Sequence, residues 1–260
     1  MKRLTSLSRS IQGKVALVTG AASGMGRATA LLFADEGARL ALVDINAQGL
    51  DEVAATIRAA GGEVLALAAD CSQREAVQNT IVRAAEHYDG LDILINNAGI
   101  VLGSDINNAE EFEVGWEISL AVMASAQQWA IRAALPWLRR AEHPRICNVA
   151  STEALGATAH NAAYVVAKHA CLGLTRAMAV ELGKEGITVN CVCPGPVKTG
   201  ITARIPEQDK QVFARRRTAL RRYAEPEEIA HVILSLVLPA AGFVTGAAVP
   251  VDGGLTIRNA

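Results

Sequence analysis

Short apolar runs alternate with longer helical stretches along most of this chain. The runs are rich in Val, Ile, Leu and Ala and show no polar alternation, which is typical of strands whose two faces are both covered. Every gap between consecutive runs is long enough for a crossover helix, so we expect the strands to be parallel. The seven predicted strands are residues 15–18, 40–43, 64–68, 93–95, 146–149, 188–192 and 248–251.

This order predicts an α/β fold, namely a Rossmann-type doubly wound seven-stranded parallel sheet with helices on both faces. Residues 47–60 are predicted to form a helix that ends at Gly61 and Gly62, and residues 227–238 a helix entered through Pro226. No linker rich in Ser, Gly or Pro divides the 260 residues. We therefore expect one domain over residues 1–260.

The stretch 232–251 carries no charged residue and is nearly as long as a membrane span. Pro239, Gly242, Gly246 and Pro250 interrupt it, which favours a buried helix, a turn and a buried strand over a membrane segment. The basic residues 1–10 are not followed by the apolar segment of a secretory signal. We therefore expect a cytoplasmic protein with no membrane partner.

Composition, charge and cysteine content disfavour several further classes of protein and site. The chain has 25 basic and 26 acidic residues and is 51% hydrophobic, which disfavours disorder and a nucleic-acid partner. Its five cysteines are an odd number without a CxxC pair, which is typical of reduced core residues. Cys191 and Cys193 are spaced to share one face of a strand, but two thiolates alone make a poor zinc site, so no metal is expected. Positive charge is concentrated in residues 198–222, a predicted substrate lid with eight basic and two acidic residues.

A glycine-rich turn links the first strand to the helix after it, with Gly20, Gly24 and Gly26 in the order Gly-x-x-x-Gly-x-Gly. The free backbone N–H groups and the positive dipole end of such a helix can bind a pyrophosphate. A tight strand-to-helix turn without a ligand is the alternative.

Asp44 closes the second predicted strand, 24 positions after Gly20. A carboxylate there can accept both hydroxyls of an adenosine ribose and would repel a 2′-phosphate. Neither Ser23 nor Ile45 supplies the cation that a 2′-phosphate would need. Strand, glycine turn and acid in this order therefore favour NAD over NADP, although Asp44 alone could equally be a solvated turn residue.

Tyr164 and Lys168 are four residues apart, and Ser151 precedes the tyrosine by thirteen residues. On a helix the tyrosine and the lysine share one face, so the ammonium favours the phenolate and makes the tyrosine a usable general base. Taken alone, such a pair is common on solvated helix faces.

Together these features resemble the short-chain dehydrogenase/reductase family in its single-domain form. The resemblance runs from Lys14 to about Thr256. Its motifs are Thr19-Gly20 with Gly24 and Gly26, Asp70, Asn96-Asn97-Ala98-Gly99, Ser151, Tyr164 with Lys168, Pro194-Gly195 with Val197 and Thr199, and Val251-Asp252-Gly253-Gly254.

The resemblance implies a nicotinamide cofactor, with Asp70 holding the adenine, Lys168 the nicotinamide ribose and Thr199 the carboxamide. Without the family match, a turn or capping role would be the better interpretation of each such residue. The cofactor residues implied in this way are Gly20, Ser23, Gly24, Met25, Gly26, Asp44, Ile45, Asp70, Cys71, Asn97, Ala98, Gly99, Tyr164, Lys168, Pro194, Gly195, Val197 and Thr199.

The implied chemistry is reversible hydride transfer between a nicotinamide and a secondary alcohol or ketone. Ser151 is expected to hold the substrate oxygen, Tyr164 to exchange its proton and Lys168 to assist Tyr164. Many relatives have an asparagine where this chain has Ser119. A proton-relay role and a helix serine bonding back to a carbonyl are equally open for Ser119.

Membership of the family does not select the substrate. Glu153, His160 and Asn161 lie near Ser151 and Tyr164 in sequence and favour a polar, sugar-like or alicyclic molecule. The basic lid admits an anionic substrate, but its arginines are better explained as solvated, helix-capping or interface residues. An NADPH-dependent biosynthetic ketoreductase and a non-catalytic NAD-binding partner or sensor protein are the alternatives. The resemblance also implies a homotetramer joined through the long helices near residues 108–140 and 162–184.

Overall fold

The computed structural model describes residues 5–259, so the basic residues Lys2 and Arg3 considered above lie outside the described part. Seven strands form one parallel sheet in the order β3-β2-β1-β4-β5-β6-β7, which confirms the predicted fold class and all seven strands. They are β1 (Val15–Thr19), β2 (Arg39–Asp44), β3 (Val64–Ala68), β4 (Ile93–Asn96), β5 (Arg145–Val149), β6 (Thr188–Pro194) and β7 (Ala248–Val251).

Four strands extend beyond their predicted ends at the carboxyl edge of the sheet. β1 continues to Thr19, β2 to Asp44, β4 to Asn96 and β6 to Pro194, and each of these residues still pairs with a neighbouring strand. The apolar pattern therefore stops before the backbone pairing does. These added residues stand where the sheet meets the site described below.

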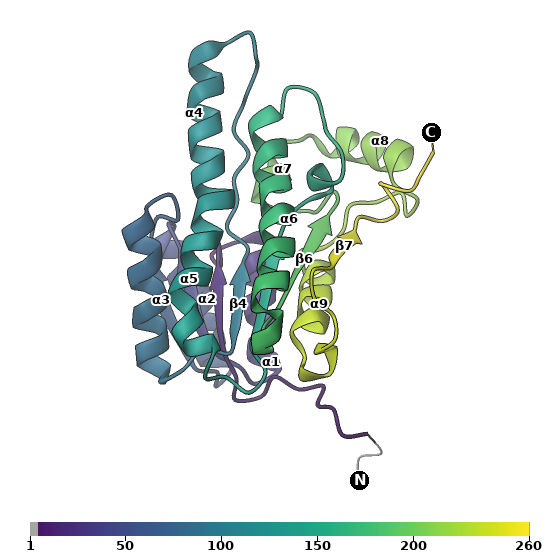
Figure 1. Ribbon diagram of the computed structural model, residues 1–260. Coiled ribbons are helices and arrows are strands. Elements are labelled where there is room, and N and C mark those ends of the chain that lie inside the picture. Colours follow the sequence, from purple (N-terminus) through teal and green to yellow (C-terminus); the bar gives the residue numbers. More distant parts are fainter. Residues whose placement is uncertain (1–4, 260) are drawn as a thin grey trace.

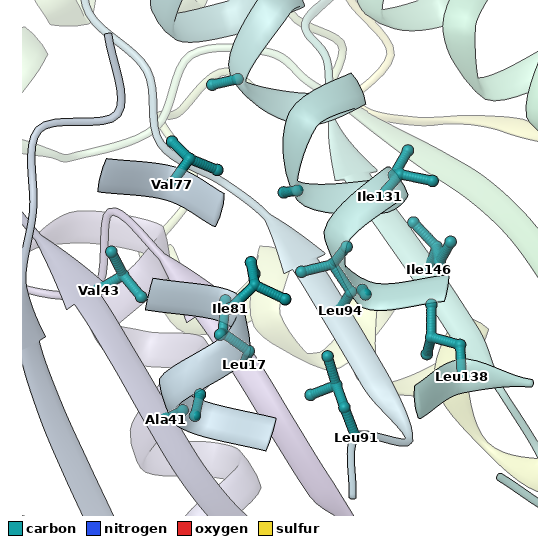
Figure 2. Close-up of a cluster of buried hydrophobic side chains, with 14 of the residues drawn as sticks. Leu17, Ala41, Val43, Val77, Ile81, Leu91, Leu94, Ile131, Leu138 and Ile146 are labelled. Carbon is teal, nitrogen blue, oxygen red and sulfur yellow. The ribbon is translucent and has the colours of Figure 1, made fainter. Parts of the chain in front are cut away.

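Helices cover both faces of the sheet (Figure 1). Side chains from α1 (Gly24–Asp35), α2 (Ala47–Ala59) and α9 (Pro226–Val237) form one buried cluster with the strands. Side chains from α3 (Arg74–Tyr88), α5 (Ala126–Leu138) and α6 (Ala162–Leu182) form the other. Figure 2 shows part of this second cluster, in which Leu17 and Leu94 of the sheet lie with Ile81 and Ile131 of the helices. Because helices cover both faces, the strands are mostly apolar.

The helix α4 (Ala109–Leu120) rises beyond the carboxyl edge of the sheet and runs on into α5 through a π-helical turn, Ala121–Ser125 (Figure 1). Short 3₁₀ turns occur at Thr152–Ala154, Gly183–Glu185 and Pro239–Ala241. The predicted lid contains α7 (Gly200–Ala203) and α8 (Glu207–Arg217). Within residues 5–259, none of the helices combines the length and the hydropathy needed to cross a bilayer.

The strand order reverses between β1 and β4, which are neighbours in the sheet although β2 and β3 separate them in sequence. In open α/β sheets, ligands bind outside the carboxyl ends of the strands at such a switch point. The fold therefore places the glycine-rich turn after β1 and the segment after β4 at the expected ligand position.

Candidate active site

A cleft of about 290 Å³ lies at the carboxyl edge of the sheet, next to the ends of β1, β4, β5 and β6. It brings together residues that the sequence marks separately. The predicted residues that line it are Gly20, Ser23, Gly24, Met25, Asp44, Asn97, Gly99, Ser151, Tyr164, Lys168, Pro194, Gly195, Val197 and Thr199. Six further residues line the cleft. Gly200, Ile201 and Thr202 belong to the predicted lid, whereas Val149, Ala150 and Pro196 carry no signal in the sequence beyond their position beside motif residues.

The N-terminus of α1 opens into this cleft. Ser23, the residue before the helix, makes no capping hydrogen bond with its side chain, and the first turn of the helix holds no acidic residue. Ser23, Gly24 and Met25 all line the cleft. A 12-residue helix with an uncapped N-terminus offers backbone N–H groups and a positive dipole end, which suit a pyrophosphate.

The glycines of the turn are required by the packing of the protein itself. A Cβ atom on Gly26 would lie 2.0 Å from the carbonyl oxygen of Gly20 and 2.5 Å from Nδ2 of Asn97. A Cβ atom on Gly24, whose φ is +53°, would lie 3.1 Å from Cγ2 of Thr199. The packing of the protein therefore requires a tight turn here even without a ligand. A tight turn and phosphate binding are compatible, so the tight turn does not argue against a bound phosphate.

Hydrogen bonds join the glycine-rich turn to the segment after β4. Nδ2 of Asn97 donates to the carbonyl oxygens of Thr19 (2.8 Å) and Gly20 (3.1 Å). Oγ1 of Thr19 in turn accepts from the amides of Asn97 and Ala98, both at 3.0 Å. Oδ1 of Asn97 is buried and has no hydrogen-bond partner among the described residues. This segment thus supports the cofactor cleft by holding its glycine turn, and Oδ1 remains as an unused acceptor.

Asp44 is held in place at the end of β2. Its Oδ2 accepts from the amide of Ala22 and its Oδ1 from the amide of Asn46, each at 2.9 Å. Both carboxylate oxygens keep a further lone pair, so the fixed carboxylate at the cleft can still accept ribose hydroxyls.

Ser151 follows β5 and is 8% exposed. Its Oγ accepts a 3.1 Å hydrogen bond from the amide of Glu153, in the 3₁₀ turn that the serine begins. Because this bond uses the oxygen as an acceptor, the hydroxyl proton stays available for donation to a bound oxygen.

Tyr164 and Lys168 lie on α6 and line the same cleft as Ser151. Lys168 is 3% exposed, and its Nζ donates to the carbonyl oxygen of Val149 at 2.8 Å. The ammonium lies 5.5 Å from the centre of the Tyr164 ring. A cation is therefore fixed beside the aromatic ring of the phenol.

The sequence matches the family described as Enoyl-(Acyl carrier protein) reductase over residues 20–256. It is also 38% identical to the meso-2,3-butanediol dehydrogenase of Serratia marcescens, in a match covering 95% of this chain and 96% of that protein. The chain belongs to the short-chain dehydrogenase/reductase family. It is therefore a nicotinamide-dependent oxidoreductase that acts on alcohols.

Two further similarities support this membership. The (2S)-[(R)-hydroxy(phenyl)methyl]succinyl-CoA dehydrogenase subunit BbsD of Thauera aromatica is 37% identical, with 95% of this chain and 98% of that protein covered. The structure of L-sorbose reductase from Gluconobacter frateurii, complexed with NADPH and L-sorbose, has a TM-score of 0.90 at 30% identity. That match covers 96% of this chain and 99% of the reductase.

Some residues that the short-chain dehydrogenase/reductase resemblance assigns to the cofactor do not line the cleft. Ile45 is 70% exposed beside it, and Gly26 and Ala98 lie behind its wall in the tight turns described above. Asp70 accepts from the amide of Ser72 in a turn. Burial, and then the charges of the nearby acids, raise the pKa of the Cys71 thiol to about 12, so the thiol stays neutral.

The three polar residues assigned to the substrate also lie outside the cleft lining. The carboxylate of Glu153 accepts from the amide (2.9 Å) and the hydroxyl (2.7 Å) of Thr158 and so closes the loop after Ser151. His160 has a positive φ of 60°, and its exposed ring lies 3.9 Å from Asp105. Asn161 precedes α6 and forms an isolated bridge with Ser104.

Ser119, which replaces the asparagine common in short-chain dehydrogenases/reductases, lies near the end of α4 and is fully buried. Its hydroxyl has no hydrogen-bond partner among the described residues, so the bond back to a helix carbonyl, one of the two roles left open above, is not formed. It does not line the cleft. The π-helical turn that begins two residues later is a local irregularity of a kind often found near functional sites.

The cations of the lid lie away from the cleft lining. The arginines Arg215–Arg217 form the last turn of α8, where positive charge favours the helix dipole. Arg222 donates to both carboxylate oxygens of Glu228 at 2.6 Å, and this pairing lowers the pKa of Glu228 to about 2. Lys198 pairs with Glu225. Helix capping and ion pairing therefore account for these cations.

Proposed function

We propose that this protein is an NAD-dependent dehydrogenase/reductase that interconverts a neutral secondary alcohol and its ketone. The observation that carries the proposal is that Ser151, Tyr164 and Lys168 line one cleft together with the uncapped N-terminus of α1. The names of the two curated relatives each specify a compound with a secondary hydroxyl group, a neutral butanediol in one case and an anionic succinyl-CoA derivative in the other, and the neighbouring reductase was solved with a ketose.

The substrate oxygen is bound by Ser151. Its Oγ accepts from the amide of Glu153, which orients the hydroxyl proton toward the cleft. The same hydrogen bond from the Glu153 amide holds the Ser151 side chain in one rotamer, so the substrate oxygen is held at one place relative to Tyr164.

Tyr164 exchanges the proton of the substrate oxygen, taking it during oxidation and returning it during reduction. Lys168 stabilises the phenolate through its nearby charge, and its hydrogen bond to Val149 keeps the ammonium in place. When bound, the nicotinamide supplies or accepts the hydride. The free N–H groups of α1 and the carboxylate of Asp44 would hold the pyrophosphate and the ribose of the dinucleotide.

The preference for NAD rests on Asp44. Its negative charge would repel a 2′-phosphate, and within the described residues the cleft lining holds no lysine or arginine other than Lys168, which lies beside Tyr164. The sorbose reductase complex contains NADPH, so this fold also binds a dinucleotide with a 2′-phosphate. The acid at the end of β2 is proposed to disfavour that phosphate in this chain.

The substrate is proposed to be neutral and either polar and sugar-like or alicyclic. The lid residue Ile201 lines the same cleft as Ser151 and Tyr164, whereas the lid arginines do not line it. An anionic group would therefore find no arginine clamp in the lining.

A homotetramer and a reducing, cytoplasmic environment complete the proposal. All five cysteines are free and buried, as expected where thiols stay reduced. Each protomer presents small and apolar residues on the outward side of two long helices, which suits helix packing between copies. These exposed residues are Val114 and Ile118 of α4 and Ala162, Val166, Gly173, Ala177 and Val180 of α6.

The test is a spectrophotometric screen at 340 nm over acyclic diols, alicyclic alcohols, sugar alcohols and matched hydroxy acids, each with NAD and with NADP. We expect turnover of neutral secondary alcohols with NAD. Turnover confined to NADPH and a ketone would identify a biosynthetic reductase instead. Tight NADH binding without turnover of any compound would indicate a non-catalytic binding protein.

A further inference from the structure

The lid is anchored firmly at its base. Residues 197 and 224, on either side of it, form a parallel bridge in which Lys198 donates to the carbonyl of Ala224 and Ala224 to the carbonyl of Pro196, at 3.0 and 2.9 Å. Three residues of α7, Gly200, Ile201 and Thr202, line the cleft together with the catalytic side chains. The distal half of the lid, from α8 onward, is outside the lining and needs an anchor of its own.

The C-terminal tail, defined as residues 252–259, supplies this anchor. Figure 1 shows the last segment of the chain passing from β7 to the neighbourhood of α8. The amide of Leu220 donates to the carbonyl of Gly253 at 3.0 Å. A Cβ atom on Gly254, whose φ is +82°, would lie 2.8 Å from Cβ of Ala219. The glycine pair thus permits a close approach between the tail and the end of the lid.

Arg258 closes this contact at the C-terminus of α8. Its Nη1 donates to the carbonyl oxygens of Arg215 (2.9 Å) and Thr218 (2.7 Å). Carbonyls at a helix C-terminus lack partners within the helix, so one charged nitrogen satisfies two of them. The arginines in the last turn of α8 repel a further cation, so these two hydrogen bonds, and not net charge, hold Arg258 there.

The other end of the tail rests against the cleft. The carboxylate of Asp252 accepts from the amides of Gly254 and Thr256, each at 2.8 Å, and from Oγ1 of Thr256 at 2.7 Å, which makes the first half of the tail a fixed turn. A Cβ atom on Gly195, a cleft residue, would lie 2.8 Å from Cα of Asp252. The tail therefore spans from a wall of the cleft to the distal end of the lid.

We propose that Arg258 is a positioning residue: through the carbonyls at the end of α8, it holds the lid over the substrate end of the cleft and so sets the affinity for the alcohol. The apparent affinity of a ligand falls with the fraction of protein in the binding-competent arrangement. Loss of the anchor therefore raises KM for the alcohol. The KM readout depends on the proposed function, whereas the position of the lid does not.

The test compares the full-length wild type with Arg258→Met, which keeps an aliphatic stem but removes the donors. Arg258 is exposed, so the replacement leaves no core cavity. Arg258→Lys is the conservative variant, because a single nitrogen makes both bonds in the native protein. Asn259→Ala is the matched control in the same tail. Measurements are KM and kcat for the alcohol, Kd for NADH, and the rate of tryptic cleavage at Arg215–Arg222 without substrate.

We expect Arg258→Met to raise KM for the alcohol and the rate of lid cleavage about tenfold each, because two charge-assisted hydrogen bonds are lost. Kd for NADH, kcat at saturation and Tm stay near the wild-type values. Arg258→Lys should recover part of both effects, and Asn259→Ala should show neither.

In a protein that oxidises alcohols, a KM unchanged in Arg258→Met overturns the proposal. If the wild type oxidises no alcohol, the proposed function fails and cleavage alone decides the placement of the lid. In that case, a rate of tryptic lid cleavage in Arg258→Met equal to that of the wild type overturns the role of Arg258.

Discussion

Oδ2 of Asp44 accepts a 2.9 Å hydrogen bond from the amide of Ala22, which ties the acid at the end of β2 to the glycine-rich turn after β1. The carboxylate is thereby fixed at the proposed adenosine end of the cleft, which the N-terminus of α1 also lines. The two groups act in opposite senses on the dinucleotide, because one favours the pyrophosphate and the other disfavours a 2′-phosphate.

Asp44→Asn should shift the cofactor preference toward NADP. The amide keeps an oxygen acceptor but loses the charge that repels a 2′-phosphate. We expect the ratio of kcat/KM for NAD to that for NADP to fall by at least about tenfold, equivalent to about 1.4 kcal/mol. Steady-state kinetics with both cofactors measures it. An unchanged ratio would show that Asp44 does not select the cofactor.

Gly26→Ala should destabilise the protein even in the absence of any cofactor. The new methyl group would meet the Gly20 carbonyl oxygen at 2.0 Å, so the turn must shift. Overpacking of this kind costs about 1–3 kcal/mol, which lowers Tm by several degrees and also weakens NADH binding. Thermal unfolding without cofactor measures the first effect. Gly90→Ala is the control, since nothing lies within 4 Å of its added Cβ atom; equal Tm values for the two variants would refute the steric argument.

Ser119→Asn should keep kcat or raise it modestly, by about two- to threefold. The serine hydroxyl is buried without a partner, and a carboxamide offers more hydrogen-bonding sites in the same region. Measurement of kcat across pH 6 to 10 for both proteins checks it. A tenfold loss of kcat would mean that the smaller side chain is required at this position.

The five thiols should be unreactive in the folded protein. Burial is the largest cause that raises the pKa values of Cys71 to about 12 and of Cys171 to about 11, so their nucleophilic thiolate forms are scarce at pH 8. All five cysteines are free and buried. Titration with a chromogenic disulfide reagent at pH 8 should therefore detect no thiol in the native protein and five in guanidinium chloride. Rapid reaction of one native thiol would contradict the described burial.

The sheet could be predicted from sequence because its strands are buried on both faces and leave continuous apolar runs. The strand ends could not be placed as well, because Asp44 and Pro194 continue the backbone pairing after the apolar pattern has ended. The spacing of Tyr164 and Lys168 was informative because both lie on one helix, where sequence distance fixes relative position.

Contacts made by loop residues could not be predicted, because residue spacing does not fix the course of a loop. The role of Glu153 toward the substrate stays a prediction: its carboxylate is outside the cleft lining and accepts from Thr158, five residues later in the same loop. The contact of Arg258 with α8 joins residues about forty positions apart, through turns whose course no periodicity encodes. For the arginines of the lid, the sequence left an anionic substrate open beside the preferred solvated, helix-capping or interface role, and Arg215–Arg217 lie in the last turn of α8.

The central claim is that Tyr164 exchanges the substrate proton beside a cation fixed by the Val149 carbonyl. The most direct test is the kcat of Tyr164→Phe, measured together with its Kd for NADH. We predict a fall in kcat of at least about 10³-fold, because general acid–base catalysis contributes about 10²–10⁴-fold and the phenol is its agent here, with Kd changed by no more than about threefold. A kcat within tenfold of the wild type would contradict the mechanism.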